Sequence, residues 1–418
     1  MSAEHLVVVG ASLAGLRAVE AARNAGFRGK ITLIGAEEHL PYDRPPLSKA
    51  FLDVNPEGAA GSPFRSEEYF QDQLDVRLVL GRPATALHTD TKSVTVGFGA
   101  SAEDINYDIL IIATGANPRR FPGAEKLDGV HALRTLDDAQ AIRKALDSNA
   151  RTVIIGAGFI GSEIASGARK RGLHPVVLEA LPTPLVRAIG QEMGEWISSL
   201  HAANGTDLRC GIGVASIEGD GKVERVVMAD GSVIPADLVV VGMGTVPAVS
   251  WLEGSGLTLD NGVVCDASLY TGVEGVYAAG DVARWLNPAY GRLMRIEHWS
   301  SAAEQGAAAA RNAVNPAAAR PYATVPYFWS DLYDVRVQFV GVNQADEITV
   351  VDGSMDQKRA TALYREGDRL VGALTVNGQT EIMKYRNLIA KEASWGEALA
   401  FAEKRKTLRE TKSSLVAG

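Results

Sequence analysis

Three glycines, Gly156, Gly158 and Gly161, have the spacing of a turn that holds the pyrophosphate of a dinucleotide. The apolar run 152–155 predicts a buried strand before the turn, and the Ala-rich segment after it predicts a helix. The first glycine would turn the chain, the second would let phosphates approach the backbone, and the third would let the helix pack on the strand. The helix N-terminus would offer free N–H groups to the phosphates. We count Ile160, inside the motif, with the glycines as a binding residue; the alternative is a tight turn without a ligand.

A carboxylate ends the second strand of this unit. Glu179 lies about 20 residues beyond the motif, where an acid accepts a hydrogen bond from an adenosine ribose. A 2′-phosphate beside it would be repelled by of order 4 kcal/mol per charge pair at 4 Å and an effective dielectric of 20. NADPH sites carry an arginine there instead, whereas residues 180–182 are Ala-Leu-Pro. The sequence therefore predicts NADH, and Arg187 leaves the use of NADPH open.

A second copy of the unit opens the chain. Residues 6–9 predict a short strand, residues 16–25 a helix and residues 31–34 the next strand. The turn between strand and helix has Ser in place of the middle glycine, and the acid is displaced by two residues. Two such units in one chain predict two bound dinucleotides, and therefore redox chemistry. The candidate residues of this copy are Gly10, Ser12, Ala14, Gly15, Ala36 and Glu37.

Each glycine motif is followed at a comparable distance by a buried strand that ends in a glycine turn. Residues 108–115 end in Ala-Thr-Gly, and residues 236–244 repeat that pattern. The repetition predicts an internal duplication of the nucleotide-binding domain. Pro118 and Pro247 follow the two strands and mark crossings between domains. We therefore expect one domain of residues 1–115 and 246–320, a second of residues 116–245, and a C-terminal α+β domain of residues 321–418.

The composition excludes several classes of protein. The 418 residues carry a net charge of −8, which argues against a nucleic-acid-binding protein. The apolar runs are far shorter than the roughly 18 residues of a membrane span, and the N-terminus lacks the basic segment of a secretory signal. Cys210 and Cys265 lie far apart, which supports neither a disulfide framework nor a metal site. A cytoplasmic protein is the simplest interpretation.

Three further segments carry polar groups in defined places. Pro45 and Pro46 fix the backbone before Ser48 and Lys49, as expected of a loop that holds a polar group, although a rigid surface turn is the alternative. Gly280-Asp281 ends a strand, so that the aspartate projects where ligands of open α/β sheets bind. Residues 301–304, Ser-Ala-Ala-Glu, have the form of a capping box and predict a helix running to about residue 313, whose positive end could face a flavin ring. An ordinary Ala-rich packing helix is the alternative.

The order of these motifs carries a resemblance. GASLAG, PYDRPPLSK, ATG, GAGFIGSE and YAAGDVA together resemble the flavoprotein reductases with two dinucleotide-binding domains, whose fold is glutathione-reductase-like. The strings PYDRPPLSK and PYFWSDLYD are similar to the NADH-dependent ferredoxin reductases of bacterial oxygenase and cytochrome P450 systems, of the putidaredoxin reductase and biphenyl dioxygenase reductase type. The resemblance runs from about Leu6 to Tyr333, and the remaining residues fit in general character.

The resemblance implies an α/β fold with two Rossmann-like domains, FAD on the N-terminal unit and NADH on the second. It places Lys49 beside the flavin and Glu163 in a pair with Lys49, flanking the nicotinamide. It places Trp329 between the flavin and a [2Fe-2S] ferredoxin, with a core-packing tryptophan as the alternative. The remaining candidate cofactor-binding residues are Arg44, Thr114, Gly115, Arg134, Gly242, Gly280, Asp281, Glu297, His298 and Trp299.

The expected reaction passes a hydride from NADH to FAD and electrons from FAD to the ferredoxin, which serves a cytochrome P450 or a ring-hydroxylating oxygenase. Cys210 is the first cysteine of the chain, so a sulfur relay near the flavin is not expected. From residue 384 onward, eight Lys and Arg oppose four Glu, which could steer an acidic ferredoxin or could be a solvated helix face. The alternatives are a reductase of rubredoxin or a small acceptor, and an FAD/NADH redox sensor. We expect a monomer or weak homodimer.

Overall fold

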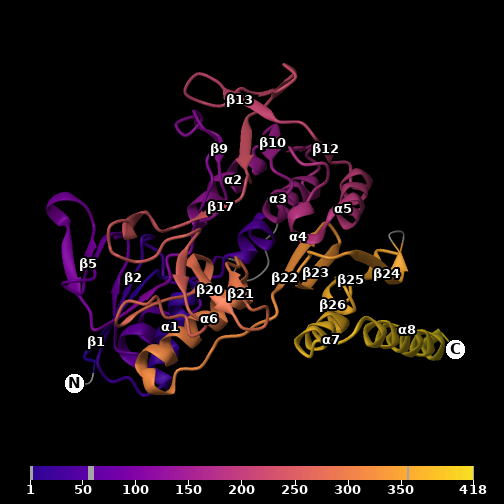
Figure 1. The fold of residues 1–418 in the computed structure, drawn as a ribbon. Coiled ribbons are helices and arrows are strands. Elements are labelled where there is room, and N and C mark those ends of the chain that lie inside the picture. The colour runs from indigo at the N-terminus through magenta and orange to yellow at the C-terminus, as the bar shows by residue number, and fades with distance from the viewer. Residues whose placement is uncertain (1–2, 55–60, 355–356, 418) are drawn as a thin grey trace. The chain divides into compact units, whose positions relative to one another are not determined.

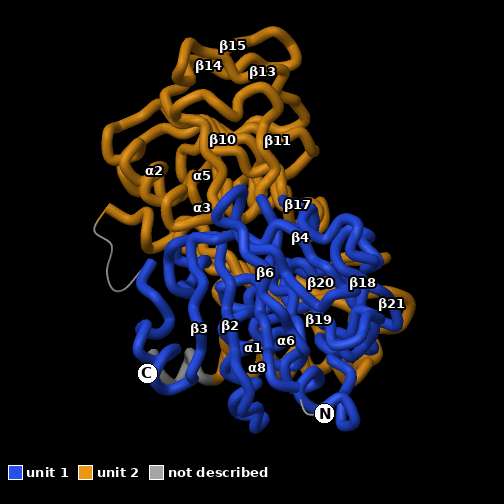
Figure 2. Tube along the Cα trace, turned by 90° about the vertical axis from the view of Figure 1, so that its left-hand side faces the viewer, with its two compact units in different colours: residues 1–46, 59–117, 245–324 blue, residues 47–58, 118–244, 325–418 orange. Residues whose placement is uncertain are grey.

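Two short runs rich in Val, Leu and Ile form the central strands of two parallel sheets, β1 (His5–Val9) and β10 (Thr152–Ile155). The computed structural model describes residues 3–54, 61–354 and 357–417. The chain divides into two compact units, which Figure 2 shows in different colours. Unit 1 comprises residues 1–46, 59–117 and 245–324, and unit 2 comprises residues 47–58, 118–244 and 325–418.

The main sheet of unit 1 has five parallel strands in the order β19-β7-β1-β2-β3. Its strands β1 and β7 are almost fully buried, as expected for continuous apolar runs that pack on both faces. Two long helices, α1 and α6, pack against each other in this unit (Figure 1). The bounds are β2 (Lys30–Ile34), β3 (Val76–Val79), β7 (Ile109–Ile112), β19 (Val276–Ala278), α1 (Leu13–Asn24) and α6 (Trp299–Val314).

Smaller sheets and single turns complete the described part of the first unit. The sheets have the orders β4-β5-β6, β18-β20-β21 and β8-β17. Their strands are β4 (Ala84–His88), β5 (Ser93–Val96), β6 (Glu103–Asn106), β8 (Ala116–Pro118), β17 (Thr245–Pro247), β18 (Val263–Cys265), β20 (Ala283–Asn287) and β21 (Arg292–Met294). The short turns are η1 (Pro45–Ser48), η2 (Ala50–Leu52), η3 (Tyr69–Gln73), η4 (Gly99–Ser101), η5 (Ser250–Leu252), η6 (Gly280–Val282) and η7 (Pro316–Ala318), of which η2 and the end of η1 fall in unit 2.

The parallel sheet of unit 2 repeats this topology. Its order is β12-β11-β10-β16-β9. Strand β10, which leads into the turn at Gly156, therefore lies between its βαβ partner β11 and β16, the strand that leads into the turn at Gly242, just as β1 lies between β2 and β7. The shared arrangement confirms the predicted α/β fold with two dinucleotide-binding sheets. The bounds are β9 (Val130–His131), β11 (Val176–Glu179), β12 (Asp207–Cys210), β13 (Val214–Glu218), β14 (Arg225–Met228), β15 (Val233–Pro235), β16 (Leu238–Val241), α2 (Leu136–Asp147), α3 (Phe159–Lys170), α4 (Val186–Ile189) and α5 (Gln191–Ala203).

The C-terminal part of unit 2 is an antiparallel sheet with two helices after it (Figure 1). These strands and helices agree with the α+β character that the sequence predicts for the end of the chain. A hydrophobic cluster joins this sheet to α5, with Trp196 of the helix and Phe339 of the sheet among its members. The bounds are β22 (Tyr327–Leu332), β23 (Val335–Gly341), β24 (Glu347–Ser354), β25 (Arg359–Glu366), β26 (Arg369–Val376), α7 (Gln379–Ala390) and α8 (Trp395–Ala417).

Two helix starts differ from the predictions. Helix α1 begins at Leu13 instead of residue 16, because the glycine turn itself takes up the first helical residues. Helix α6 begins at Trp299, so the predicted capping box at 301–304 is wrong. Ser301 is buried inside the first turn, and the Glu304 carboxylate accepts a hydrogen bond from the Tyr322 hydroxyl at 2.8 Å instead of folding back to a cap.

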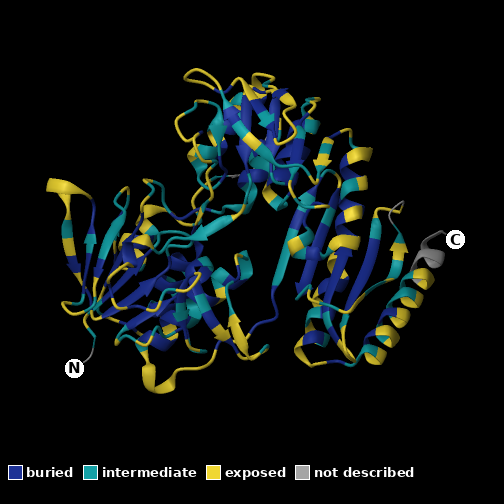
Figure 3. Cartoon of the chain, turned by 45° about the horizontal axis from the view of Figure 1, so that its top comes forward, coloured by how far each residue is buried: buried dark blue, intermediate teal, exposed yellow. Residues whose placement is uncertain are grey.

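Burial follows the sheets in both units. Figure 3 shows the parallel strands in the colour of buried residues, whereas α8 is exposed along much of its length. Within the described ranges, none of the helices combines the length and the apolar character that crossing a bilayer requires.

Candidate functional site

The glycine turn of unit 1 is formed by close backbone contacts. Gly10 has a φ of +121°, and a Cβ atom there would lie 2.1 Å from the carbonyl oxygen of Ala113. A Cβ on Gly15 would lie 1.9 Å from the carbonyl oxygen of Gly10, so the helix can start this close to the strand only with glycine. Ser12 is the N-cap of α1, and its side chain accepts no capping hydrogen bond from the backbone N–H groups of the described helix. The N–H groups of the first turn, which includes Ala14, can therefore bind an anionic group.

A cluster of polar side chains lies beside this turn. The Arg44 guanidinium donates to the Ser12 hydroxyl at 3.2 Å and to the Glu37 carboxylate at 2.5 Å. The Tyr42 hydroxyl donates to the other Glu37 oxygen at 2.6 Å. Glu37 is thus fixed at the end of β2 by two donors, and Ala36 before it is exposed. Arg44 joins the displaced acid to the phosphate-binding turn, an arrangement that the linear spacing of these residues does not indicate.

The carboxyl ends of β7 and β19 carry the other predicted residues of unit 1. Thr114 donates to the Ala248 carbonyl at 2.9 Å, and Gly115 follows it with a φ of +72°. Gly280 lies so close to α1 that a Cβ atom there would be 3.1 Å from the Ala14 side chain. Asp281 follows Gly280 within η6, the turn that packs on the start of α1.

Gln305 was not predicted, and it lies behind this turn. Its side chain is completely buried in α6 and accepts a hydrogen bond from the Gly280 N–H at 2.8 Å. Its Nε2 has no hydrogen-bond partner among the described residues, and a buried donor of this kind is expected to meet a ligand or water. The signal that could have found it is its position one turn after Ser301 on the buried face of an Ala-rich helix.

The last three predicted cofactor residues of this unit lie just before α6 and at its first position. Glu297 accepts hydrogen bonds from Thr245 and, at 2.6 Å, from Arg295. His298 precedes the helix, and burial lowers the pKa of its imidazole to about 4. Trp299 donates its indole N–H to Asp43 at 2.7 Å. Arg295 also donates to the carbonyl of Asp281 at 3.2 Å, which links this segment to the turn at the end of β19.

In unit 2 the second glycine turn has the same construction. A Cβ on Gly156 would lie 2.3 Å from the Gly242 carbonyl, and one on Gly161 would lie 2.1 Å from the Gly156 carbonyl. Around Gly158, in contrast, no described atom lies within 4 Å of the place where a Cβ would be. This open space at the N-cap of α3, next to the partly exposed Ile160, is what a pyrophosphate approaching the backbone requires.

Glu179 ends β11 with its carboxylate fixed in place. One oxygen accepts the N–H of Ala157 in the glycine turn at 2.8 Å, and the other accepts the N–H of Leu181 at 2.9 Å. Cys210 lies opposite Glu179 on β12, and burial together with the Glu179 charge raises the pKa of its thiol. Burial raises the pKa of the Cys265 thiol to about 12. Both cysteines are free, and neither has the lowered pKa of a redox thiol.

The predicted pair of Lys49 and Glu163 is present within unit 2. The Lys49 ammonium lies 2.9 Å from each oxygen of the Glu163 carboxylate. Glu163 belongs to α3 and is only 4% exposed, so its charge needs partners. It also accepts hydrogen bonds from the hydroxyls of Ser48 and Ser330, the latter at 2.5 Å. Ser330 was not predicted, although strand alternation beside Trp329 indicates that it faces the opposite side of β22.

Trp329 and Arg134 lie on other elements of unit 2. Trp329 is half-buried on β22 and stacks on Tyr327, with ring centroids 5.9 Å apart and planes 24° apart. Gln338, opposite Trp329 on β23, donates to the Tyr327 hydroxyl at 2.7 Å. Arg134 precedes α2, and its backbone N–H donates to the Asp138 carboxylate at 3.0 Å.

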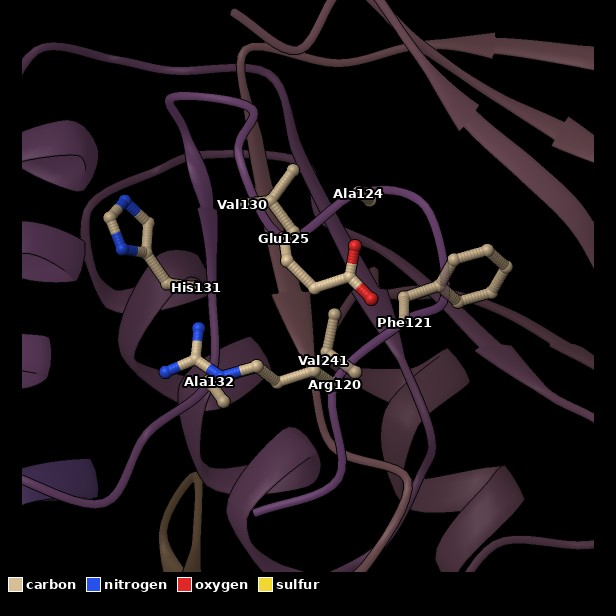
Figure 4. A pocket seen from close by; sticks show the side chains of 8 residues that line it. All are labelled: Arg120, Phe121, Ala124, Glu125, Val130, His131, Ala132 and Val241. Atoms are coloured by element: carbon tan, nitrogen blue, oxygen red, sulfur yellow. The ribbon is translucent and has the colours of Figure 1, made fainter. Parts of the chain in front are cut away.

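A small pocket lies beside β9 and β16. Figure 4 shows the side chains of Arg120, Glu125 and His131 around it, with Val130 and Val241 from the two strands. Burial lowers the pKa of His131. Across the part of the chain that the structure covers, no group of three or more His, Cys, Asp or Glu side chains is arranged to hold a metal ion.

Two parallel sheets, each with an open helix N-terminus after a glycine turn, define a protein that binds two dinucleotides. The chain belongs to the family described as pyridine nucleotide-disulphide oxidoreductase, which matches residues 4–306, and residues 327–411 match the reductase C-terminal family. It is an oxidoreductase by this membership.

Known relatives extend over nearly the whole chain. The chain is 37% identical over 390 residues to rhodocoxin reductase of Rhodococcus erythropolis, covering 93% of this chain and 90% of the relative. It is 36% identical over 395 residues to the anthranilate 1,2-dioxygenase system ferredoxin–NAD(+) reductase component of Burkholderia cepacia, covering 94% and 96%. The reductase in the crystal structure of the covalent putidaredoxin reductase–putidaredoxin complex superposes with a TM-score of 0.88 at 32% identity, covering 94% of each chain.

Proposed function

We infer that this chain is an NADH-dependent ferredoxin reductase that uses FAD. The observation that carries the inference is its 36% identity, over 94% of the chain, with a component named for ferredoxin–NAD(+) reduction in a dioxygenase system. When bound, FAD supplies the step between the two-electron donor NADH and a one-electron acceptor such as a [2Fe-2S] ferredoxin. We propose that the ferredoxin serves a cytochrome P450 or a ring-hydroxylating oxygenase.

Unit 1 supplies most of the groups that would hold FAD. The N–H groups at Ser12, Ala14 and Gly15 would bind its pyrophosphate, and the Glu37 carboxylate, fixed by Arg44, would accept from its adenosine ribose. The open N-terminus of α1 and the buried Nε2 of Gln305 support this assignment. The other proposed FAD residues are Gly10, Ala36, Thr114, Gly115, Arg134, Gly280, Asp281, Glu297, His298 and Trp299.

Unit 2 would bind NADH at its glycine turn. The open space at Gly158 fits the pyrophosphate, and the fixed Glu179 carboxylate fits a ribose with a free 2′-hydroxyl. The same carboxylate would repel the 2′-phosphate of NADPH. Gly156, Ile160, Gly161 and Gly242 complete the proposed NADH residues.

We propose that Lys49 stabilises the negative charge of the reduced flavin and that Glu163 orients the Lys49 ammonium. A single lysine held by both oxygens of a buried carboxylate is fixed in direction, which favours a positioned charge over a mobile one. Trp329, with Tyr327 stacked on it, would guide electrons toward the ferredoxin. The same proposal assigns FAD binding to residues 1–115 and 246–320, NADH binding to 116–245 and the partner interface to 321–418, in a monomeric or weakly dimeric cytoplasmic enzyme.

Anaerobic stopped-flow reduction of the purified yellow protein tests the proposal. NADH should bleach the flavin faster than NADPH, and the reduced enzyme should then pass electrons rapidly to one member of a panel of [2Fe-2S] ferredoxins. A colourless protein would refute the FAD assignment. Reduction by NADH that stalls with every ferredoxin, rubredoxin and quinone acceptor would instead indicate a redox sensor.

A further inference from the structure

The Glu163 carboxylate on α3 accepts hydrogen bonds from two other segments of unit 2. Ser48 and Lys49 come from the turn at 45–52, Glu163 itself from α3, and Ser330 from β22. The carboxylate is 4% exposed and Ser330 is fully buried. In such a place a carboxylate is stable only if its oxygens are hydrogen-bonded, so each donor influences where the charge is held.

The donors are divided evenly between the two oxygens. Ser48 donates to Oε2 and Ser330 donates to Oε1 at 2.5 Å, while the Lys49 ammonium lies 2.9 Å from both. The two hydroxyls thus hold the carboxylate from opposite ends, and the ammonium is centred between its oxygens. Without the Ser330 hydroxyl, Oε1 would keep Lys49 as its only described partner, and more of the carboxylate charge would act on the ammonium.

Ser330 also joins the strand of Trp329 to helix α3. Adjacent residues of a strand point to opposite faces, and Ser330 is fully buried whereas Trp329 is half-buried. A second bond attaches the same strand end to the same helix, because the backbone N–H of Tyr333 donates to Ser166 at 2.8 Å. Only the Ser330 bond reaches the carboxylate, so the two attachments can be separated by substitution.

We propose that Ser330 is a positioning residue for flavin reduction, acting through Glu163 on the Lys49 ammonium. The inference rests on the proposed roles of Lys49 and Glu163. The Ser330 hydroxyl stabilises part of the negative charge on the Glu163 carboxylate. Less of that negative charge then offsets the positive charge that Lys49 presents to the reduced flavin. Removing its hydroxyl makes the flavin midpoint potential more negative and slows reduction by NADH, whereas removing the Glu163 charge makes the potential more positive.

The test uses the FAD-loaded enzyme with Ser330→Ala, Glu163→Gln and the double variant. Ser166→Ala is the matched control, since it loosens the same helix–strand attachment without touching the carboxylate. The flavin potential is measured by equilibration with a reference dye, and flavin reduction is followed by anaerobic stopped flow. We expect Ser330→Ala to reduce about tenfold more slowly, the loss of one hydrogen bond to a charged group. Ser166→Ala should stay within about twofold and keep the wild-type potential.

The decisive result is the double-mutant cycle. In the Glu163→Gln background, Ser330→Ala should change neither the reduction rate nor the potential further. In the enzyme that retains Glu163, Ser330→Thr, which keeps the hydroxyl, should keep the wild-type potential. Additive effects of the two substitutions, or equal effects of Ser330→Ala and Ser166→Ala, would overturn the inference. If Glu163→Gln alone had the wild-type flavin potential and reduction rate, the proposed role of the Lys49–Glu163 pair would fail. If Glu163→Gln changed both quantities while Ser330→Ala changed neither, only the role of Ser330 would fail.

Discussion

Replacing Glu179 by glutamine should relax the preference for NADH over NADPH. The substitution removes the charge at the end of β11 but keeps a carbonyl oxygen that can accept from Ala157 or Leu181. Because both carboxylate oxygens are bound by backbone N–H groups, the charge cannot swing away from an incoming 2′-phosphate. The wild-type carboxylate should therefore repel the 2′-phosphate of NADPH.

The magnitude follows from Coulomb's law with a correction for solvent. A charge pair at about 4 Å and an effective dielectric of about 20 repels by roughly 4 kcal/mol. Glu179 is partly exposed, so screening reduces the effective term to about 1–2 kcal/mol. Relief of this repulsion should raise kcat/KM for NADPH, and through it the ratio of NADPH to NADH, by about fivefold to thirtyfold. The KM for NADH should rise by about threefold to tenfold, because a bond to a charged acceptor becomes a neutral one.

Steady-state kinetics with both coenzymes and an artificial acceptor measure this ratio. Asp207→Asn is the matched control, because it removes a similar negative charge from the neighbouring strand β12. Asp207 lies at the amino end of that strand, opposite Val176 and away from Glu179 along the strand. An unchanged coenzyme ratio in Glu179→Gln, or an equal change in Asp207→Asn, would refute the reasoning from Glu179.

Three other predictions test the remaining parts of the site. Lys49→Met should slow flavin reduction by NADH at least about tenfold, because one positioned charge is lost. The control Lys170→Met, which breaks the exposed pair with Asp53, should leave this rate unchanged. Equal reduction rates for Lys49→Met and the wild type in stopped flow would contradict the role of Lys49. Trp329→Ala should keep NADH oxidation with a small dye but lose most ferredoxin reduction, and Trp329→Phe should retain more of it; parallel loss of both activities would point to a structural role. Burial lowers the pKa of His201 to about 4, below its usual value of about 6.5. Between these two pH values His201 is protonated in the unfolded chain but not in the folded one, so lowering the pH favours the unfolded state. The free energy of unfolding should thus fall by about 2–3 kcal/mol between pH 7 and pH 4 because of His201 alone; His201→Gln should remove that part of the slope in urea unfolding, and an unchanged slope would show that His201 is protonated in the folded state.

Local patterns predicted the strands and glycine turns well. Each motif is written in residues within about six positions of one another, and a Cβ at Gly15 or Gly161 would collide with the carbonyl of Gly10 or Gly156 in the same turn. Helix starts were predicted less well. The capping box at 301–304 satisfied a local pattern, but tertiary packing buried Ser301 and gave Glu304 a partner in Tyr322. A real capping box opens α2 at Thr135, where Asp138 takes the place of the usual glutamate.

The sequence by itself determined two dinucleotide-binding units, their order and the acid that should select NADH, because these are short-range patterns of glycines, apolar runs and a carboxylate. The resemblance paired Lys49 with Glu163, but the tertiary structure decided that Ser48 and Ser330 also bind this carboxylate. Ser48, Lys49 and Ser330 reach it across 115, 114 and 167 residues of chain, and separations of that size leave no local pattern. The physical reason is that a buried charge must be satisfied by whatever donors the packing of α3 against β22 and the turn at 45–52 brings within reach.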